Sequence, residues 1–303
     1  EKTFAFSYPE IEAYASGWAW DDYEYAFQAE NTSLPIYGNQ FWVESDSNHL
    51  FSTTPEYFQK MMIPSEKKRY SGLKLYREKD QNVFSYSIGH IDSIEHRSIP
   101  FKTSTDLTKR LLEDTLNTSI TRVEIDSVLP NKLASVSRDS VLQFMMTQSD
   151  NFIAEQLLYN GSFKTFGRFD RDEFIQYSLD SVLHFIKDRP KWVDGSGLSR
   201  YNLATPYSLF QVLRRVYENQ PKNLFLLAKN GEEGTLKNRL TDYPVFFYGK
   251  TGTLSNNHSI AGIFRTKSRK DIAIVLMYNH YKTSLRHVYD EIDAIISRFY
   301  LEY

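Results

Sequence analysis

Two short polar motifs contain the residue types that acid–base and anion-binding chemistry needs. The first is Ser-Asp-Asn at 149–151, and the second is Lys-Thr-Gly-Thr at 250–253. A lysine with neighbouring hydroxyl groups can hold a carboxylate, and a positioned serine can pass a proton. Each motif alone also has a structural explanation, because Ser, Asp and Asn cap helices and a lysine at a strand edge is commonly solvated. Their meaning therefore depends on the elements that position them.

Both motifs lie at predicted element boundaries. Residues 137–161 read as two helices that meet at Ser149. The lysine motif stands between an aromatic run at 246–247 and an apolar alternation at 260–264, which predicts two strands of an antiparallel meander. A third strand at 270–281 and a closing helix at 284–300 follow, and further helices are predicted at 104–118, 171–188 and 205–219.

The first hundred residues have a different character. They contain short aromatic and β-branched runs separated by polar or proline-containing breaks, at 40–45, 49–54, 73–78 and 83–91. We therefore expect a β-rich region over 1–100 and a layered domain of helices and antiparallel strands over 101–303. The fold class is α/β in the broad sense, of the α+β type.

Composition narrows the function classes. The net charge of -2 and the absence of a long basic stripe do not favour nucleic-acid binding, and no apolar run is long enough to span a membrane. Zero cysteines exclude disulfides and thiolate sites, and the seven histidines form no H-E-x-x-H motif, so neither a metal nor another cofactor is expected. The opening lacks Met and a signal-peptide pattern, so we expect a chain that begins after processing or inside a longer protein.

The two motifs together match two of the three motifs of serine β-lactamases and penicillin-binding proteins. Three further stretches, "SGWAWDDYEYAF" at 16–27, "DGSGLSRYNLATP" at 194–206 and "EGTLKNRL" at 233–240, narrow the match. With them the chain resembles the class C low-molecular-mass penicillin-binding proteins, the D-alanyl-D-alanine carboxypeptidase/endopeptidase family. The resemblance implies a serine β-lactamase/transpeptidase-like layered domain with an antiparallel sheet, and a β-rich inserted region at 1–100.

The resemblance also implies roles at the second motif. The substrate would be a peptidoglycan stem peptide ending in D-Ala-D-Ala, or a β-lactam in its place. Lys250 would supply the positive field for the terminal carboxylate, and Thr251 a hydroxyl donor. Gly252 would leave room for the substrate as an added strand, and the N–H of Thr253 would contribute to the oxyanion hole.

At the first motif, Ser149 would pass a proton to the leaving amine and Asn151 would orient the substrate amide and the catalytic lysine. Asp150 is expected to cap a helix or to face away from the site. Other polar residues near these motifs are interpreted as architectural, namely Asp194, Ser196, Arg200, Thr235 and Arg239, and His258 as a residue at the start of a strand.

The family's third motif, S-x-x-K, supplies the acylated serine. The chain holds two matches, Ser65 to Lys68 and Ser71 to Lys74, both in a polar, basic loop without a following apolar helix. An activated serine needs a rigid helix start, so neither match fits. In the family this motif precedes the segment similar to 16–27, and the nucleophile is expected to be absent from the 303 residues.

Three readings remain. The first is a serine-type D-alanyl-D-alanine carboxypeptidase or endopeptidase, extracytoplasmic and periplasmic after removal of a signal peptide. The second is a non-catalytic peptidoglycan-binding homologue, and the third a β-lactamase-like hydrolase. The absence of E-x-x-L-N between the motifs counts against the third, and retention of Ser149, Asn151, Lys250 and Thr251 favours the first. The sequence does not separate carboxypeptidase from endopeptidase action or give the oligomeric state.

Overall fold

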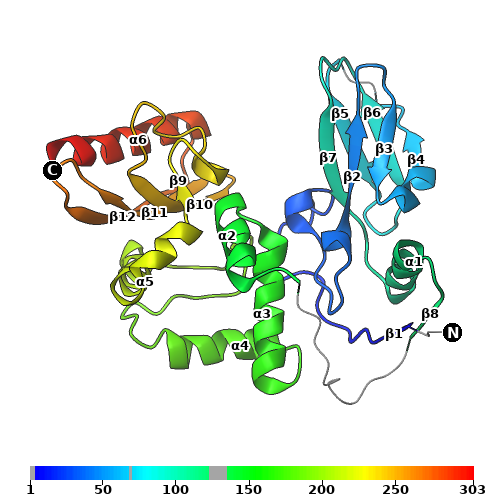
Figure 1. The fold of residues 1–303 in the computed structure, drawn as a ribbon, viewed down its shortest axis with the longest axis horizontal. Coiled ribbons are helices and arrows are strands. Elements are labelled where there is room, and N and C mark those ends of the chain that lie inside the picture. Colours follow the sequence, from blue (N-terminus) through cyan, green and yellow to red (C-terminus); the bar gives the residue numbers. More distant parts are fainter. Residues whose placement is uncertain (1–3, 68–69, 123–134) are drawn as a thin grey trace. The chain divides into compact units, whose positions relative to one another are not determined.

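The computed structural model describes residues 4–67, 70–122 and 135–303. The chain divides into two compact units, residues 1–133 and 134–303 (Figure 1).

The first unit is built from short strands. Strands β2 (Gln40–Ser45), β3 (Phe51–Thr54) and β7 (Glu95–Pro100) form one antiparallel sheet in the order β3-β2-β7. A second sheet, in the order β4-β6-β5, contains β4 (Met62–Pro64), β5 (Leu73–Arg77) and β6 (Phe84–Ile88). Short strands β1 (Phe4–Phe6) and β8 (Ile120–Arg122) pair in parallel. The predicted runs at 40–45, 49–54, 73–78 and 83–91 all contain a strand, whereas β1, β4, β7 and β8 were missed.

Aromatic side chains fill the core of this unit. Phe41 stacks on Phe58 with ring centroids 4.2 Å apart, and Phe58 stacks in turn on Phe101 at 5.2 Å. Helix α1 (Thr105–Leu116), capped by Ser104, adds Leu107 and Leu111 to the same cluster. This helix was expected to open the second domain. Its apolar face instead lies in the first core, so the compact unit extends beyond residue 100; that residues 1–100 are an insertion stays a prediction.

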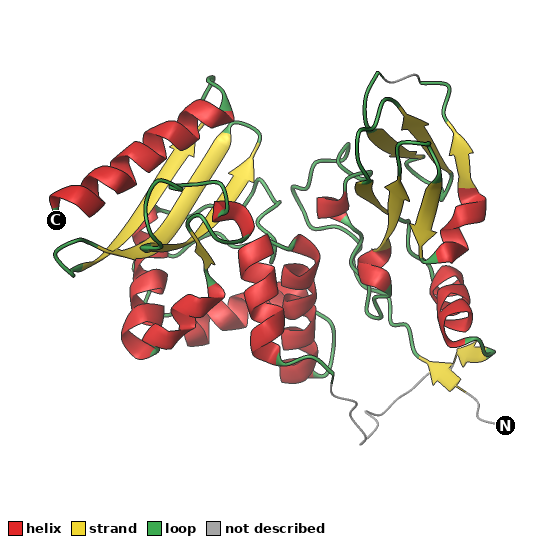
Figure 2. Ribbon diagram, turned by 45° about the horizontal axis from the view of Figure 1, so that its top comes forward, coloured by secondary structure: helices red, strands yellow, loops and turns green. Residues whose placement is uncertain are grey.

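The second unit is layered around an antiparallel sheet of order β12-β11-β10-β9. Its strands are β9 (Ala228–Lys229), β10 (Phe247–Leu254), β11 (Asn257–Arg265) and β12 (Asp271–Asn279). Helix α6 (Leu285–Glu302) lies along one face and buries Val288, Ile292 and Ile296 against residues of the sheet (Figure 2). The meander and the closing helix therefore agree with the sequence prediction.

The opposite face of this sheet is covered by helices. Helix α5 (Pro206–Asn219) packs on β11 and β12 through Leu213, with Met146 of α2 (Arg138–Gln148) in the same cluster. Helix α3 (Asn151–Phe166) follows α2 directly (Figure 1). Helix α4 (Arg171–Tyr177) is shorter than the predicted 171–188 and passes into a π-turn at Ser178–Val182. There the hydroxyl of Ser178 donates to Phe174 O at 2.7 Å, a back-bond that bends helices.

Candidate active site

The Ser-Asp-Asn motif forms the junction between α2 and α3. Ser149 ends α2 in the left-handed conformation (φ 59°, ψ 50°), and its N–H donates to Met145 O. Asp150 then caps α3 by accepting from the N–H of Ile153 at 2.8 Å. The expected capping role of Asp150 is confirmed. Asn151 is the first residue of α3 and is half-buried.

Lys250 reaches this junction from the sheet. Its Nζ donates to Ser149 Oγ at 2.6 Å and to its neighbour's carbonyl, Thr251 O, also at 2.6 Å. Burial lowers the pKa of the Lys250 ammonium to about 8. The contact joins residues 101 positions apart in the chain. It brings the two sequence motifs into one partly desolvated polar site.

The strand that carries Lys250 has an open edge beside the site. Strand β9 pairs with β10 only at Tyr248 and Gly249, so no described strand pairs with the outer edge of β10 from Lys250 onward. No atom lies within 4 Å of the place where a Cβ on Gly252 would stand. An extended peptide could therefore add along this edge.

The side chains of this strand alternate between two faces. Lys250 points toward Ser149, while Thr251 and Thr253 belong to the face that α6 covers, together with their cross-strand partners Ile260 and His258. Thr251 is largely buried and Thr253 is exposed.

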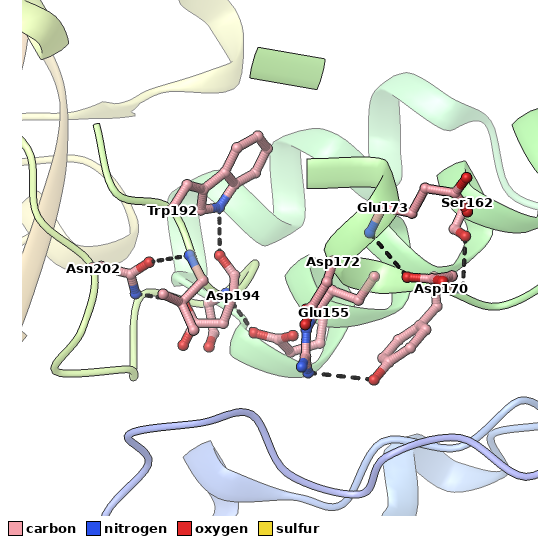
Figure 3. Close-up of polar contacts among 12 residues, drawn as sticks. Glu155, Ser162, Asp170, Asp172, Glu173, Trp192, Asp194 and Asn202 are labelled. Carbon is pink, nitrogen blue, oxygen red and sulfur yellow. Dashed lines mark hydrogen bonds and ion pairs between the residues drawn. The ribbon is translucent and has the colours of Figure 1, made fainter. Parts of the chain in front are cut away.

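A glycine-rich loop packs against the start of α3. Asp194 is buried and its carboxylate accepts from the N–H groups of Gly197 and Ser199 and from the amide of Asn202, at 2.6 to 2.9 Å (Figure 3). Trp192 Nε1 donates to Asp194 O at 2.6 Å. These bonds agree with the interpretation of this loop as structured, with Asp194 as its organiser.

Glu155 is a residue that the sequence interpretation missed. It is 1% exposed, and its Oε1 accepts from the N–H of Ser196 at 2.7 Å, while Oε2 has no hydrogen-bond partner. Burial raises the pKa of its carboxyl to about 7. Glu155 stands four residues after Asn151, hence on the same face of α3. An acid inside the apolar run "NFIAEQLL" was the available signal.

The loop 194–202 also reaches the sheet. Arg200 Nη1 donates to Ser255 O at 3.3 Å, in the turn between β10 and β11. At its other end, a Cβ on Gly195 would lie 2.4 Å from Ala154 O of α3. The loop thus connects the helix that begins with Asn151 to the strand that carries Lys250.

The segment 233–240 packs against α2 close to Ser149. Gly234 has a positive φ of 58°, and a Cβ there would lie 2.0 Å from Thr147 O, two residues before Ser149. Arg239 forms a two-pronged ion pair with Asp293 of α6, at 2.6 and 2.8 Å. Arg239 is architectural, as expected.

The two S-x-x-K matches lie in the first unit, and neither serine begins a helix. Ser65 follows β4, and Ser71 forms an isolated bridge with His90 before β5. Lys68 lies outside the described residues, and the ammonium of Lys74 lies 3.9 Å from Glu24 Oε1. Nothing in these surroundings resembles an activated nucleophile.

Comparison with known proteins fixes the family. The model of the D-Ala-D-Ala carboxypeptidase 3 (S13) family matches residues 7–299. The chain belongs to this family. In sequence, this S13 chain is 26% identical over 308 residues to the D-alanyl-D-alanine carboxypeptidase DacB of Haemophilus influenzae, covering 88% of the chain and 62% of that protein. It is 27% identical over 183 residues to the penicillin-sensitive carboxypeptidase A of Dictyostelium discoideum, covering 54% and 34%.

The fold agrees with that assignment. The S13 chain matches the crystal structure of penicillin binding protein 4 from Haemophilus influenzae with a TM-score of 0.73 and 20% identity, over 96% of this chain and 72% of that one. The predicted fold class is confirmed. The chain spans 62% of the length of DacB. No helix in the described part of the chain is long and apolar enough to cross a membrane.

Proposed function

We propose that this S13 protein is a serine-type D-alanyl-D-alanine carboxypeptidase or endopeptidase that acts on peptidoglycan stem peptides through an acyl-serine intermediate. The observation that carries the proposal is the contact between Lys250 Nζ and Ser149 Oγ. It supports one site built from both family motifs. A periplasmic location and recognition of β-lactams are parts of the same proposal.

Lys250 supplies positive charge, and Ser149 transfers a proton. At neutral pH Lys250 is largely protonated, because the pKa of its ammonium is about 8, and its charge attracts the terminal carboxylate. Ser149 Oγ accepts a hydrogen bond from that ammonium. The serine can therefore give its own proton to the leaving amine and be reprotonated by Lys250. Asn151, at the start of α3, orients the substrate amide.

The substrate lies along the open edge of β10. Gly252 leaves space for its backbone, and the N–H of Thr253 contributes to the oxyanion hole together with the nucleophile's own N–H. Thr251 adds a hydroxyl toward the same carboxylate from the edge of the α6 face. Binding as an added strand aligns the scissile bond with the site.

We propose further that the nucleophile is not among these 303 residues. The surroundings of Ser65 and Ser71 support this, because neither stands at a helix start. The chain by itself then binds D-Ala-D-Ala peptides without hydrolysing them.

The test is intact mass spectrometry of the chain after incubation with a labelled penicillin, together with calorimetric titration of N-acetyl-D-Ala-D-Ala. We expect peptide binding and no covalent adduct. Stoichiometric acylation would place the nucleophile within the chain, with Ser65 and Ser71 the first candidates. Absence of binding by both peptide and penicillin would contradict the shared site of Ser149 and Lys250.

A further inference from the structure

His258 is the buried neighbour of the exposed end of the lysine motif. It pairs with Thr253 across the β10–β11 ladder, and its Nδ1 lies 2.8 Å from Thr253 Oγ1. The side chain is fully buried, and its Nε2 has no hydrogen-bond partner. The hydroxyl of the exposed Thr253 is therefore hydrogen-bonded to a buried imidazole on the neighbouring strand β11.

The groups around His258 keep its ring neutral. Burial and the Arg239 guanidinium lower its pKa to about 4, against an opposing effect of Asp293. Tyr289 of α6 contacts both groups. Its ring centroid lies 4.8 Å from that of His258, and the Arg239 guanidinium lies 4.1 Å from the centroid of the Tyr289 ring. A neutral imidazole carries one proton, on either Nδ1 or Nε2.

The surroundings decide between these two tautomers. A proton on Nε2 would be a buried donor without an acceptor, whereas a bare Nε2 is an unfilled acceptor, which folded proteins tolerate more often.

We infer that His258 is a positioning residue whose Nδ1–H donates to Thr253 Oγ1, which leaves the Thr253 hydroxyl proton free to donate to a ligand carboxylate along the open edge of β10. In the other tautomer the Thr253 hydroxyl would donate its hydrogen bond to Nδ1. It would then present only lone pairs to the ligand, and these repel an anion. The identity of the ligand rests on the proposed function, while the tautomer does not.

The tautomer can be read directly in the ligand-free protein. Nitrogen-15 labelling of histidine and two-bond nitrogen–hydrogen correlation spectra at pH 7 distinguish Nδ1–H from Nε2–H. We expect the Nδ1–H pattern for His258, with no protonation above about pH 5 given a pKa near 4. An Nε2–H pattern, with that proton directed at the Tyr289 ring, would overturn the inference.

Two variants test the consequence for binding. Asparagine places an amide nitrogen near the position of Nδ1, whereas leucine places a methyl group there. We expect His258→Leu to weaken N-acetyl-D-Ala-D-Ala about tenfold and His258→Asn less than about threefold, since one charge-assisted hydrogen bond is at stake. Equal affinities for the two variants at matched melting temperatures would reduce His258 to a core residue.

The two hypotheses fail separately. If the unmodified chain does not bind the peptide, the proposed function is wrong, and the nitrogen-15 spectrum still decides the tautomer. If the chain binds the peptide but the spectrum shows Nε2–H, the inference alone is wrong.

Discussion

Two glutamates are buried in the described residues, one in each unit, and their surroundings differ. Glu30 of the first unit is 4% exposed; its Oε1 accepts from Tyr14 Oη at 3.1 Å, and its Oε2 accepts from both the N–H and the hydroxyl of Thr103, at 2.7 and 2.6 Å. In the second unit, Oε1 of Glu155 accepts a hydrogen bond from the Ser196 N–H, and Oε2 has no hydrogen-bond partner.

The difference separates two uses of a buried charge. Around Glu30 every carboxylate oxygen is satisfied, so the group ties segments of the first unit together. Around Glu155 the desolvation is only partly offset, which raises its pKa. A buried carboxyl with a raised pKa is tolerated where the position of the group matters more than its cost in stability. Glu155 lies one helical turn from Asn151.

The largest expected effect comes from removing the satisfied carboxylate. Glu30→Met leaves the donors of Tyr14 and Thr103 without their acceptor, and we expect a loss of about 3 to 5 kcal/mol in the free energy of unfolding. The matched variant Glu155→Met leaves Ser196 without the carboxylate it bonds, but it also removes a buried carboxyl whose Oε2 has no hydrogen-bond partner, so its cost is about 1 kcal/mol or less at pH 7. Urea unfolding followed by circular dichroism measures both. Equal costs would break the comparison.

The second prediction concerns pH. The folded protein holds the Glu155 proton with a pKa of about 7, against an ordinary value of 4.5, so the folded state binds more protons between these values. Stability therefore falls as pH rises through this window, by at most about 3 kcal/mol.

The isosteric Glu155→Gln variant does not titrate. We expect its stability relative to the unmodified chain to rise from pH 4.5 to 7 and then to level off, in urea titrations at each pH. Trp192 is the one tryptophan in the sequence after residue 133, and its fluorescence reports this loop. A stability difference that stays constant with pH would mean that Glu155 has an ordinary pKa.

The third prediction concerns how closely the loop packs on α3. A Cβ on Gly195 would meet the Ala154 backbone at 2.4 Å, so Gly195→Ala displaces the loop and costs about 2 kcal/mol. Gly197→Ala is the control, because its φ of 81° brings strain of about 1 kcal/mol but no atom lies within 4 Å of the new methyl group. Trp192 fluorescence should shift only in the Gly195 variant; a shift in both would indicate general loosening of the loop.

The sequence predicted the parts of the fold that depend on local pattern. The strands around Lys250 follow from apolar alternation, and the helix junction at Ser149 follows from capping residues. The association of the two motifs came from their resemblance to a family, because no local pattern shows that residues so far apart touch.

Tertiary contacts account for what was missed. The apolar pattern of helix α1 is compatible with either unit. Only its packing with Phe41 and Phe58 places the helix in the first unit. Glu155 was missed because a single sequence does not show that Ser196 would cover it. His258 was correctly predicted to begin a strand, yet its bond to Thr253 depends on the hairpin register.

The central claim is that Lys250, held against Ser149, recognises a terminal carboxylate. The direct test compares the affinities of N-acetyl-D-Ala-D-Ala and its C-terminal amide for the unmodified chain and for Lys250→Met, between pH 6.5 and about 9.5, a range that brackets the lysine pKa of about 8. We predict a preference for the acid of about tenfold at pH 7, which declines as pH rises through about 8 and is absent in Lys250→Met. The same preference in both proteins would contradict the account.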